Sequence, residues 1–220
     1  MKGIILNYKT IKQIYEYNPE KLTLDEINKL SKFEEKRVKI NKKEFVQIIN
    51  VLGKLINNGA FENLDESQMF IINLNNSIAE FDILTVLKYK DVNVILNIEV
   101  KECKEESCKN DIESKLEKQL QNRIEDHLQQ MFIEDTYMVL GYINEEFYRC
   151  LYKEKEGKCE TINEDKALEL INKFKYNSQT YSKIQISDNL SNIQNVYSKL
   201  KNNEFKMYAI NKKELDKIYK

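Results

Sequence analysis

The chain contains 220 residues, enough for one domain with appendages or for one and a half domains, and 41 per cent of them are hydrophobic. Its 35 basic and 36 acidic residues leave a net charge of −1, which argues against a uniformly basic protein that coats nucleic acid but still permits a locally basic groove. No apolar run approaches the ~20 residues of a membrane span, and the first residues are too weakly apolar for a signal peptide, so we expect a cytoplasmic protein.

Residues 1–42 are interpreted as a small accessory segment without recognisable chemistry. A short strand is expected over residues 4–8, followed by a helix that Pro19 ends. Thr23 and Glu26 have the spacing of a capping box, which predicts the start of a second helix.

A stronger helical pattern starts at Lys43. Apolar residues recur at helical spacing through residues 45–56, and an Asn-Asn-Gly sequence ending at Gly59 then stops the helix in the manner of a C-cap.

Three strands are predicted after this helix. Residues 68–74 form the first apolar run. Residues 81–89 and 92–100 are rich in β-branched and aliphatic side chains and flank a short polar turn, which predicts a β-hairpin. Together the three runs predict an antiparallel meander.

The end of this hairpin carries the polar residues of greatest interest. Successive side chains of a strand point to opposite faces, so Glu99 and Lys101 share one face while Ile98 and Val100 point to the other. If strand pairing brings the polar faces together, Asp82, Glu99 and Lys101 converge at a solvent-exposed strand end.

Two carboxylates in this position have a defined chemistry. Asp82 and Glu99 can hold a hard divalent cation such as Mg²⁺ or Mn²⁺ and leave positions open for water and a substrate phosphate. Such a cation activates the water and stabilises charge on the phosphate, while Lys101 positions the water or offsets phosphate charge. These groups are the ones required for phosphodiester hydrolysis.

A long helix and a buried strand are predicted next. Apolar residues repeat every fourth position over residues 112–128, and Gln119, Arg123 and His127 form a parallel polar row beside them. The near-continuous apolar run at 137–143 predicts a strand buried on both faces. The order of elements from Lys43 onward is therefore αβββαβ.

Asp82 followed by the Glu99-Val100-Lys101 sequence at the end of a hydrophobic strand resembles the core motif of PD-(D/E)XK nucleases. In that family the first acid lies on the second core strand and the E-x-K sequence on the third, with a helix after it. Phe81 stands where the family has proline. The resemblance implies an α/β protein with a restriction-endonuclease-like αβββαβ core over residues 43–175, in which helices flank a mixed central sheet.

The same resemblance implies further site residues. The helix before the sheet often contributes an additional acid, for which Glu44 is the candidate and Glu62 the alternative. The helix after E-x-K carries a glutamine or basic residue near the metal, which corresponds to Gln119, with Gln121 as the other candidate. If this helix packs over the hairpin, Arg123 contacts a substrate phosphate through its planar fork.

The remaining chain contributes no motif. Residues 147–153 are predicted as an edge strand, and residues 163–174 as a helix for which Asn163 is the N-cap. Residues 176–220 are interpreted as a C-terminal extension with a strand at 181–186 and helices at 189–201 and 211–219. Residues 205–219 resemble, weakly, the lead-in to an ATPase domain, which implies a helicase or ATPase partner.

The sequence therefore predicts a metal-dependent nuclease acting on DNA, in defence against foreign DNA or in repair. One alternative is a non-catalytic nucleic-acid-binding or protein-interaction module that keeps the nuclease fold. A second alternative is a purely structural α/β domain in which Asp82 and Glu99 lie far apart.

Overall fold

The computed structural model describes residues 2–30, 41–75, 79–102, 109–128, 131–132, 136–143, 146–153, 156–180 and 183. Its helices are α1 (Tyr8–Tyr17), α2 (Leu24–Leu30), α3 (Lys42–Asn57), α4 (Lys109–Asn122) and α6 (Glu164–Ile171), with a short 3-10 turn η1 (Pro19–Lys21) and a π-helical segment η3 (Arg123–Leu128). Its strands are β1 (Lys2–Asn7), β2 (Met69–Asn75), β3 (Glu80–Tyr89), β4 (Val92–Lys101), β5 (Thr136–Ile143), β6 (Glu146–Lys153) and β7 (Glu156–Ile162).

The strands form one mixed sheet whose order follows the chain from β1 to β7. Neighbouring strands are antiparallel except β4 and β5, which are parallel and joined through α4 and η3. The predicted meander is present as β2, β3 and β4, and the order α3–β2–β3–β4–α4–β5 is the predicted αβββαβ. The expectation of a mixed sheet flanked by helices is confirmed.

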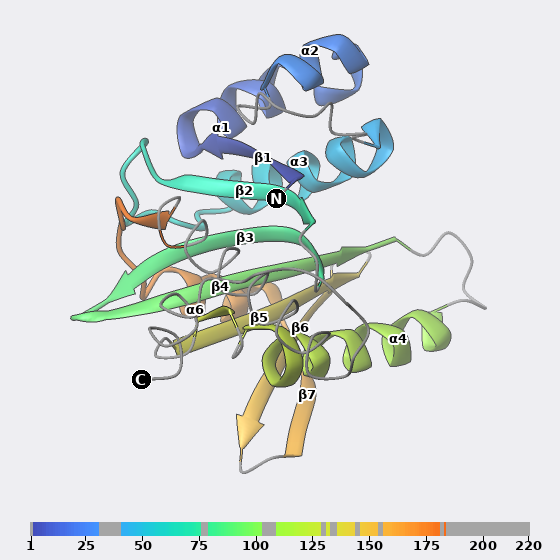
Figure 1. The fold of residues 1–220 in the computed structure, drawn as a ribbon, viewed down its shortest axis with the longest axis vertical. Coiled ribbons are helices and arrows are strands. Elements are labelled where there is room, and N and C mark those ends of the chain that lie inside the picture. Colours follow the sequence, from blue (N-terminus) through green and yellow to red (C-terminus); the bar gives the residue numbers. More distant parts are fainter. Residues whose placement is uncertain are drawn as a thin grey trace, which may run out of the picture.

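The two faces of the sheet carry separate hydrophobic clusters, because side chains alternate along each strand. On one face, Ile49 of α3 and Ile171 of α6 belong to one cluster with Ile98 of β4. On the other face, Leu120 of α4 belongs to a cluster with Val139 of β5. Figure 1 shows this arrangement, with α1 and α3 together at the top and α4 alongside the later strands at the lower right.

Local sequence signals determine several helix ends as predicted. The backbone N–H of Glu26 donates to Thr23 Oγ1 at 3.2 Å and that of Thr23 donates to Glu26 Oε2 at 2.8 Å, so the capping box is formed. Asn163 accepts a hydrogen bond from the Lys166 backbone at 2.9 Å and is the N-cap of α6. These contacts satisfy N–H groups that have no partner inside the helix.

The predicted accessory segment shares the core of the rest of the chain. β1 pairs with β2, so the sheet begins inside residues 1–42. α1 packs closely on α3 at Gly53, where an added Cβ would lie 2.1 Å from Cγ of Tyr15. A side chain larger than glycine would therefore separate the two helices. The predicted boundary at residue 42 does not divide two cores.

The carboxyl end of the described chain is also built into the sheet. Lys175 forms an isolated bridge with Lys88, and Asn177 and Thr180 are buried. The Gln68 amide donates to Thr180 Oγ1 at 3.0 Å and its carbonyl oxygen accepts from the Asn177 backbone at 2.9 Å. Residues 175–180 thus continue the core past the boundary predicted at 175.

The predicted edge strand at 147–153 is wrong in one respect, because β6 is not at the edge. β7 pairs with it over its whole length, from Phe147 opposite Ile162 to Lys153 opposite Glu156. The sequence of β7 is polar and carries no apolar alternation, so its strand character comes from pairing with β6.

Some predictions lie outside the described residues: the strand at 181–186, the helices at 189–201 and 211–219, and the ATPase-like lead-in at 205–219. Among the helices that the structure describes, none has the length and apolar character needed to cross a membrane.

Candidate active site

Asp82 lies where the pairing of β3 and β4 ends. The ladder runs from Tyr89 opposite Val92 to Ile83 opposite Ile98 and stops there. One residue further, the Val100 backbone N–H donates to Asp82 Oδ2 at 2.7 Å. The carboxylate thus takes the place of a backbone carbonyl between the two strands, and this fixes its position.

The neighbouring strand β2 is irregular opposite Asp82. Asn73 of β2 lies between the paired positions on either side of Asp82 and has a φ of 51°. Asparagine tolerates this left-handed conformation better than most residues do. The alternation of faces changes here, since Ile83 packs on the α3 side while Phe81, two residues earlier, packs on the α4 side.

Lys101 lies close to Asp82 at the end of β4. Lys101 Nζ lies 3.8 Å from Asp82 Oδ2, and their side chains are 36% and 21% exposed. Both residues line a cleft of about 310 Å³. Glu44, the predicted additional acid, lines the same cleft from α3, whereas Glu62 lines neither this cleft nor its neighbour. Asp82, Lys101 and Glu44 therefore face a common space that solvent can enter.

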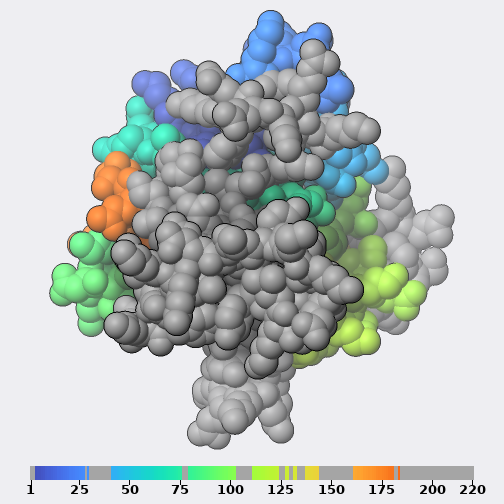
Figure 2. Space-filling model, viewed as in Figure 1, coloured from blue at the N-terminus to red at the C-terminus, as the bar shows by residue number. Residues whose placement is uncertain are grey.

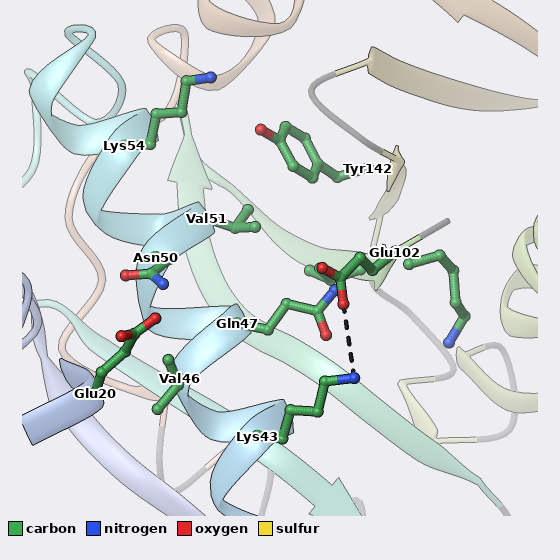
Figure 3. Close-up of a pocket in the computed structure, with 11 residues that line it drawn as sticks. Glu20, Lys43, Val46, Gln47, Asn50, Val51, Lys54, Glu102 and Tyr142 are labelled. Atoms are coloured by element: carbon green, nitrogen blue, oxygen red, sulfur yellow. Dashed lines mark ion pairs between the residues drawn. The ribbon is translucent and has the colours of Figure 1, made fainter. Parts of the chain in front are cut away.

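A second cleft, of about 380 Å³, adjoins the first along α3 (Figure 3). Its α3 side is a polar stripe with helical spacing: Lys43, Gln47, Asn50 and Lys54. The opposite wall includes Tyr142, and Glu102 lies 3.8 Å from Lys43 in an ion pair.

The two clefts together are not basic. The positive side chains that line them are Lys43, Lys54 and Lys101, and the negative ones are Glu20, Glu44, Asp82 and Glu102. The net charge of the chain still permitted a locally basic groove. The described residues that line these two clefts do not form one.

Glu99 is placed differently from the prediction. It is fully buried beneath α4, so the expectation of a solvent-exposed strand end is wrong for this residue. Gln119 Nε2 donates to Glu99 Oε2 at 2.6 Å, and Arg123 Nε donates to Glu99 Oε1 at 2.9 Å. Each carboxylate oxygen therefore already has a side-chain partner, as buried polar groups require.

The electrostatics of Glu99 reflect this position. Burial is the largest influence and raises the pKa of Glu99, and the nearby Asp82 carboxylate raises it further. Arg123 and Lys101 oppose the shift, and the pKa is about 7 instead of 4.5. The carboxyl group thus titrates near neutrality.

Arg123 is buried as well, with 9% of its side chain exposed. Its guanidinium also donates to the Glu80 carbonyl, lies 3.1 Å from His127 Nδ1 through Nη1, and stacks 5.0 Å from the centre of the Phe81 ring. The predicted contact with a substrate phosphate is not available to Arg123 in this arrangement. Gln119 and Arg123, two residues of the polar row, both bind Glu99.

Gly141 makes this arrangement possible, and the sequence interpretation missed it. It lies directly beside Glu99 in the parallel pairing of β4 and β5. A Cβ at this position would lie 2.5 Å from Leu116 Cδ2 and 3.1 Å from Leu120 Cδ1. Glycine inside an apolar strand indicates a close approach of another segment, which here is α4.

The donor set fits a hard divalent cation in chemical type, because Asp82 and Glu99 are neighbouring carboxylates. Asp82 faces the cleft, whereas Glu99 would have to exchange a hydrogen bond for the cation. Within the part of the chain that the structure describes, no three histidine, cysteine, aspartate or glutamate side chains form a metal-binding group. Any further ligands of the cation would be backbone oxygens, water or substrate.

Comparisons of the chain with protein-family models, with curated proteins and with solved structures found no match. An acid and an amine that meet in a cleft, next to a second, buried acid, can bind a cation and orient a phosphate.

Proposed function

We propose that this protein is a metal-dependent nuclease of the PD-(D/E)XK type that hydrolyses phosphodiester bonds, with DNA as the expected substrate. The observation that carries the proposal is the meeting of Asp82 and Lys101 in a cleft at the end of β4, directly beside Glu99. The αβββαβ order supports it, because the family resemblance implied the same order.

Asp82 and Glu99 would hold Mg²⁺ or Mn²⁺. When bound, such a cation supplies Lewis-acid activation of water and charge stabilisation at the phosphate. Asp82 is oriented for this task by the Val100 N–H, and a carboxylate that accepts this bond keeps lone pairs for another ligand. Glu44 lines the same cleft from α3 and would act on the cation through a bound water molecule.

Lys101 provides the cationic donor at the mouth of the cleft. Its ammonium group carries three N–H donors on a flexible stem and is partly exposed. It can therefore hold a water molecule or a phosphate oxygen while remaining near Asp82. Gln119 orients the Glu99 carboxylate through its 2.6 Å hydrogen bond and is a positioning residue in this scheme.

The substrate would enter along α3. Lys43, Gln47 and Lys54 present cationic and amide donors along one side of the adjoining cleft (Figure 3). Such donors suit contacts to a phosphate backbone, which position nucleic acid without reading its sequence. A helicase or ATPase partner, and a role in defence or repair, are proposed only from the resemblance of residues 205–219 and of the core motif.

One observation favours the second candidate, a non-catalytic nucleic-acid-binding or interaction module with the same fold. Both oxygens of Glu99 are occupied by Gln119 and Arg123, so the second acid is held as a structural residue in this arrangement. The two candidates differ in whether Glu99 is ever released to a cation.

The deciding experiment incubates pure protein with linear, circular and single-stranded DNA, with Mg²⁺, with Mn²⁺ and with a chelator. We expect cleavage only with a divalent cation, and none from Asp82→Asn. Lys166→Ala is the matched control, because it removes an exposed ion pair of α6 far along the chain from the cleft residues. Cation-independent cleavage, or full activity of Asp82→Asn, would rule the proposal out.

A further inference from the structure

Glu99 and Arg123 form a buried ion pair at the centre of the proposed site. The Glu99 side chain is 0% exposed and that of Arg123 is 9% exposed. The remaining oxygen of Glu99 is bound by Gln119, which lies one helical turn before Arg123. One continuous helical run thus supplies both partners of the carboxylate.

Arg123 is held on Glu99 by more than this pair. Its guanidinium donates to the Glu80 carbonyl and lies over the Phe81 ring at 5.0 Å. Glu80 and Phe81 directly precede Asp82 in the chain. Arg123 therefore connects Glu99 with the strand segment that places Asp82, the acid that faces the cleft.

Arg123 is also the first residue of η3, the π-helical segment Arg123–Leu128. π-helical turns are rare and are found frequently at functional sites. The regular α4 ends at Asn122, so the helix changes its hydrogen-bonding pattern at the residue that binds Glu99.

The charges of the site are balanced without a metal ion. Asp82 lies 3.8 Å from Lys101, and Glu99 lies 2.9 Å from Arg123, so two carboxylates face two side-chain cations. A divalent cation placed between the carboxylates would supply charge that Arg123 now supplies. A carboxylate oxygen whose lone pair accepts the Arg123 N–H is not open to a cation on that side.

We propose that Arg123 and a divalent cation are alternative partners of Glu99. Arg123 is a positioning residue that keeps the buried carboxylate ordered, and the cation gains Glu99 only when the guanidinium leaves it. This inference rests on the proposed function in that Asp82 and Glu99 are taken as the cation ligands. The larger the fraction of molecules in which Arg123 is bound to Glu99, the weaker the apparent affinity for the cation should be.

The test measures Mn²⁺ binding by titration calorimetry on variants shown to be folded by circular dichroism. Arg123→Lys keeps the positive charge but loses the planar fork, and Gln119→Leu removes the other donor to Glu99. Both should bind Mn²⁺ more tightly than the wild type, by roughly tenfold for Arg123→Lys. Adding Glu99→Gln to either variant should remove the gain. Lys115→Ala is the control and should bind as the wild type does, because Lys115 is an exposed residue of α4, and part of this helix lies at the surface in Figure 2.

A second readout follows the guanidinium itself. In the wild type, the nuclear magnetic resonance signal of the Arg123 Nε–H should be protected and should shift or broaden with solvent exchange when Mg²⁺ is added. Asp82→Asn should need more Mg²⁺ for the same change, because one cation ligand is weakened.

The outcomes separate this inference from the nuclease proposal. Unchanged or weaker Mn²⁺ binding in both Arg123→Lys and Gln119→Leu overturns it, as does Mg²⁺ binding that leaves the Arg123 signal unmoved. If Mg²⁺ releases Arg123 but the protein cuts no DNA, the exchange of Arg123 for a cation at Glu99 is supported and the nuclease proposal is refuted. Absence of cation binding in every variant defeats both.

Discussion

The buried pair of Glu99 and Arg123 makes a quantitative prediction about stability. Replacing Arg123 by Met leaves a carboxylate that is 0% exposed, close to the Asp82 charge, with only the Gln119 amide as partner. Breaking a buried ion pair from one side costs roughly 3–5 kcal/mol, because the remaining charge stays desolvated. Glu99→Leu should cost a similar amount, since it leaves the buried guanidinium without a counter-ion.

The double variant Glu99→Leu with Arg123→Met should be far less damaged than the two single effects suggest. No charge then remains buried, and hydrophobic replacement of a buried pair is often close to neutral. Loss of the partners of Gln119 and of the Glu80 carbonyl should leave a deficit of about 1–3 kcal/mol. The coupling between the two sites is therefore expected to be ~3 kcal/mol or more.

The assay is urea unfolding followed by far-ultraviolet circular dichroism, at pH 8 and at pH 5.5. The deficit of Arg123→Met should shrink at the lower pH, because protonation of Glu99 removes the buried charge. Lys166→Ala, whose partner Glu169 is exposed, should cost less than ~1 kcal/mol and serves as control. Single deficits below ~1 kcal/mol, or deficits that simply add in the double variant, would refute the buried pair.

Three further predictions concern the same site. The pKa of Glu99 in the folded state is about 7, above its ordinary 4.5, so the stability that this group contributes is fully present below about pH 4.5 and is lost as the pH rises to about 7. The free energy of unfolding, measured by urea titration, should therefore fall by ~3 kcal/mol over this range. Glu99→Gln should remove this dependence on pH. Lys101→Ala should change the free energy of unfolding by less than ~1 kcal/mol, because its 3.8 Å ion pair with Asp82 is partly exposed. The same variant should lower the single-turnover cleavage rate by ~100-fold or more. Unchanged cleavage would remove Lys101 from the mechanism. Gly141→Ala should destabilise the fold by roughly 1–3 kcal/mol, because the new Cβ would lie 2.5 Å from Leu116 Cδ2. The same change should weaken the nuclear magnetic resonance signal of the Arg123 Nε–H, which donates to Glu99. An undisturbed signal would contradict the close docking of α4.

The fold was predictable where the pattern is local. The apolar alternation of β3 and β4 and the polar turn between them specify a hairpin, and the apolar run of β5 specifies a buried strand. The helical stripe of α3 specifies the face that packs on the sheet. These signals depend on side-chain periodicity within one element, so a single sequence contains them.

The site was predictable only in part, since its geometry depends on contacts between distant segments. Alternation predicts that Glu99 and Lys101 share one face, but it cannot say that α4 covers Glu99 while Lys101 lines the cleft beside α3. A polar residue late in a strand is usually exposed, and Glu99 departs from this because Arg123 and Gln119 satisfy it.

A prediction about the site residues changes in consequence. A solvent-exposed strand end is the ground for expecting Asp82→Ala and Glu99→Ala to abolish activity and leave the fold intact. That ground holds for Asp82, which is partly exposed, although its bond to the Val100 N–H is lost. It does not hold for Glu99, whose removal leaves the buried Arg123 without its counter-ion. A loss of activity in Glu99→Ala is therefore informative only beside Glu99→Gln and an unfolding curve.

The position of Gly141 connects the fold to the chemistry of the site. Because it has no side chain, α4 approaches β5 closely enough for Leu116 and Leu120 to cover it. The same approach brings the polar row of the helix over Glu99, the residue beside Gly141 in the sheet. Burial of Glu99 and its pairing with Arg123 thus have one cause, the docking depth of α4. A change that moves α4 away from the sheet would expose Glu99 and separate it from Arg123 at the same time. Whether Glu99 can bind a cation therefore depends on the packing of α4 as well as on the carboxylate itself.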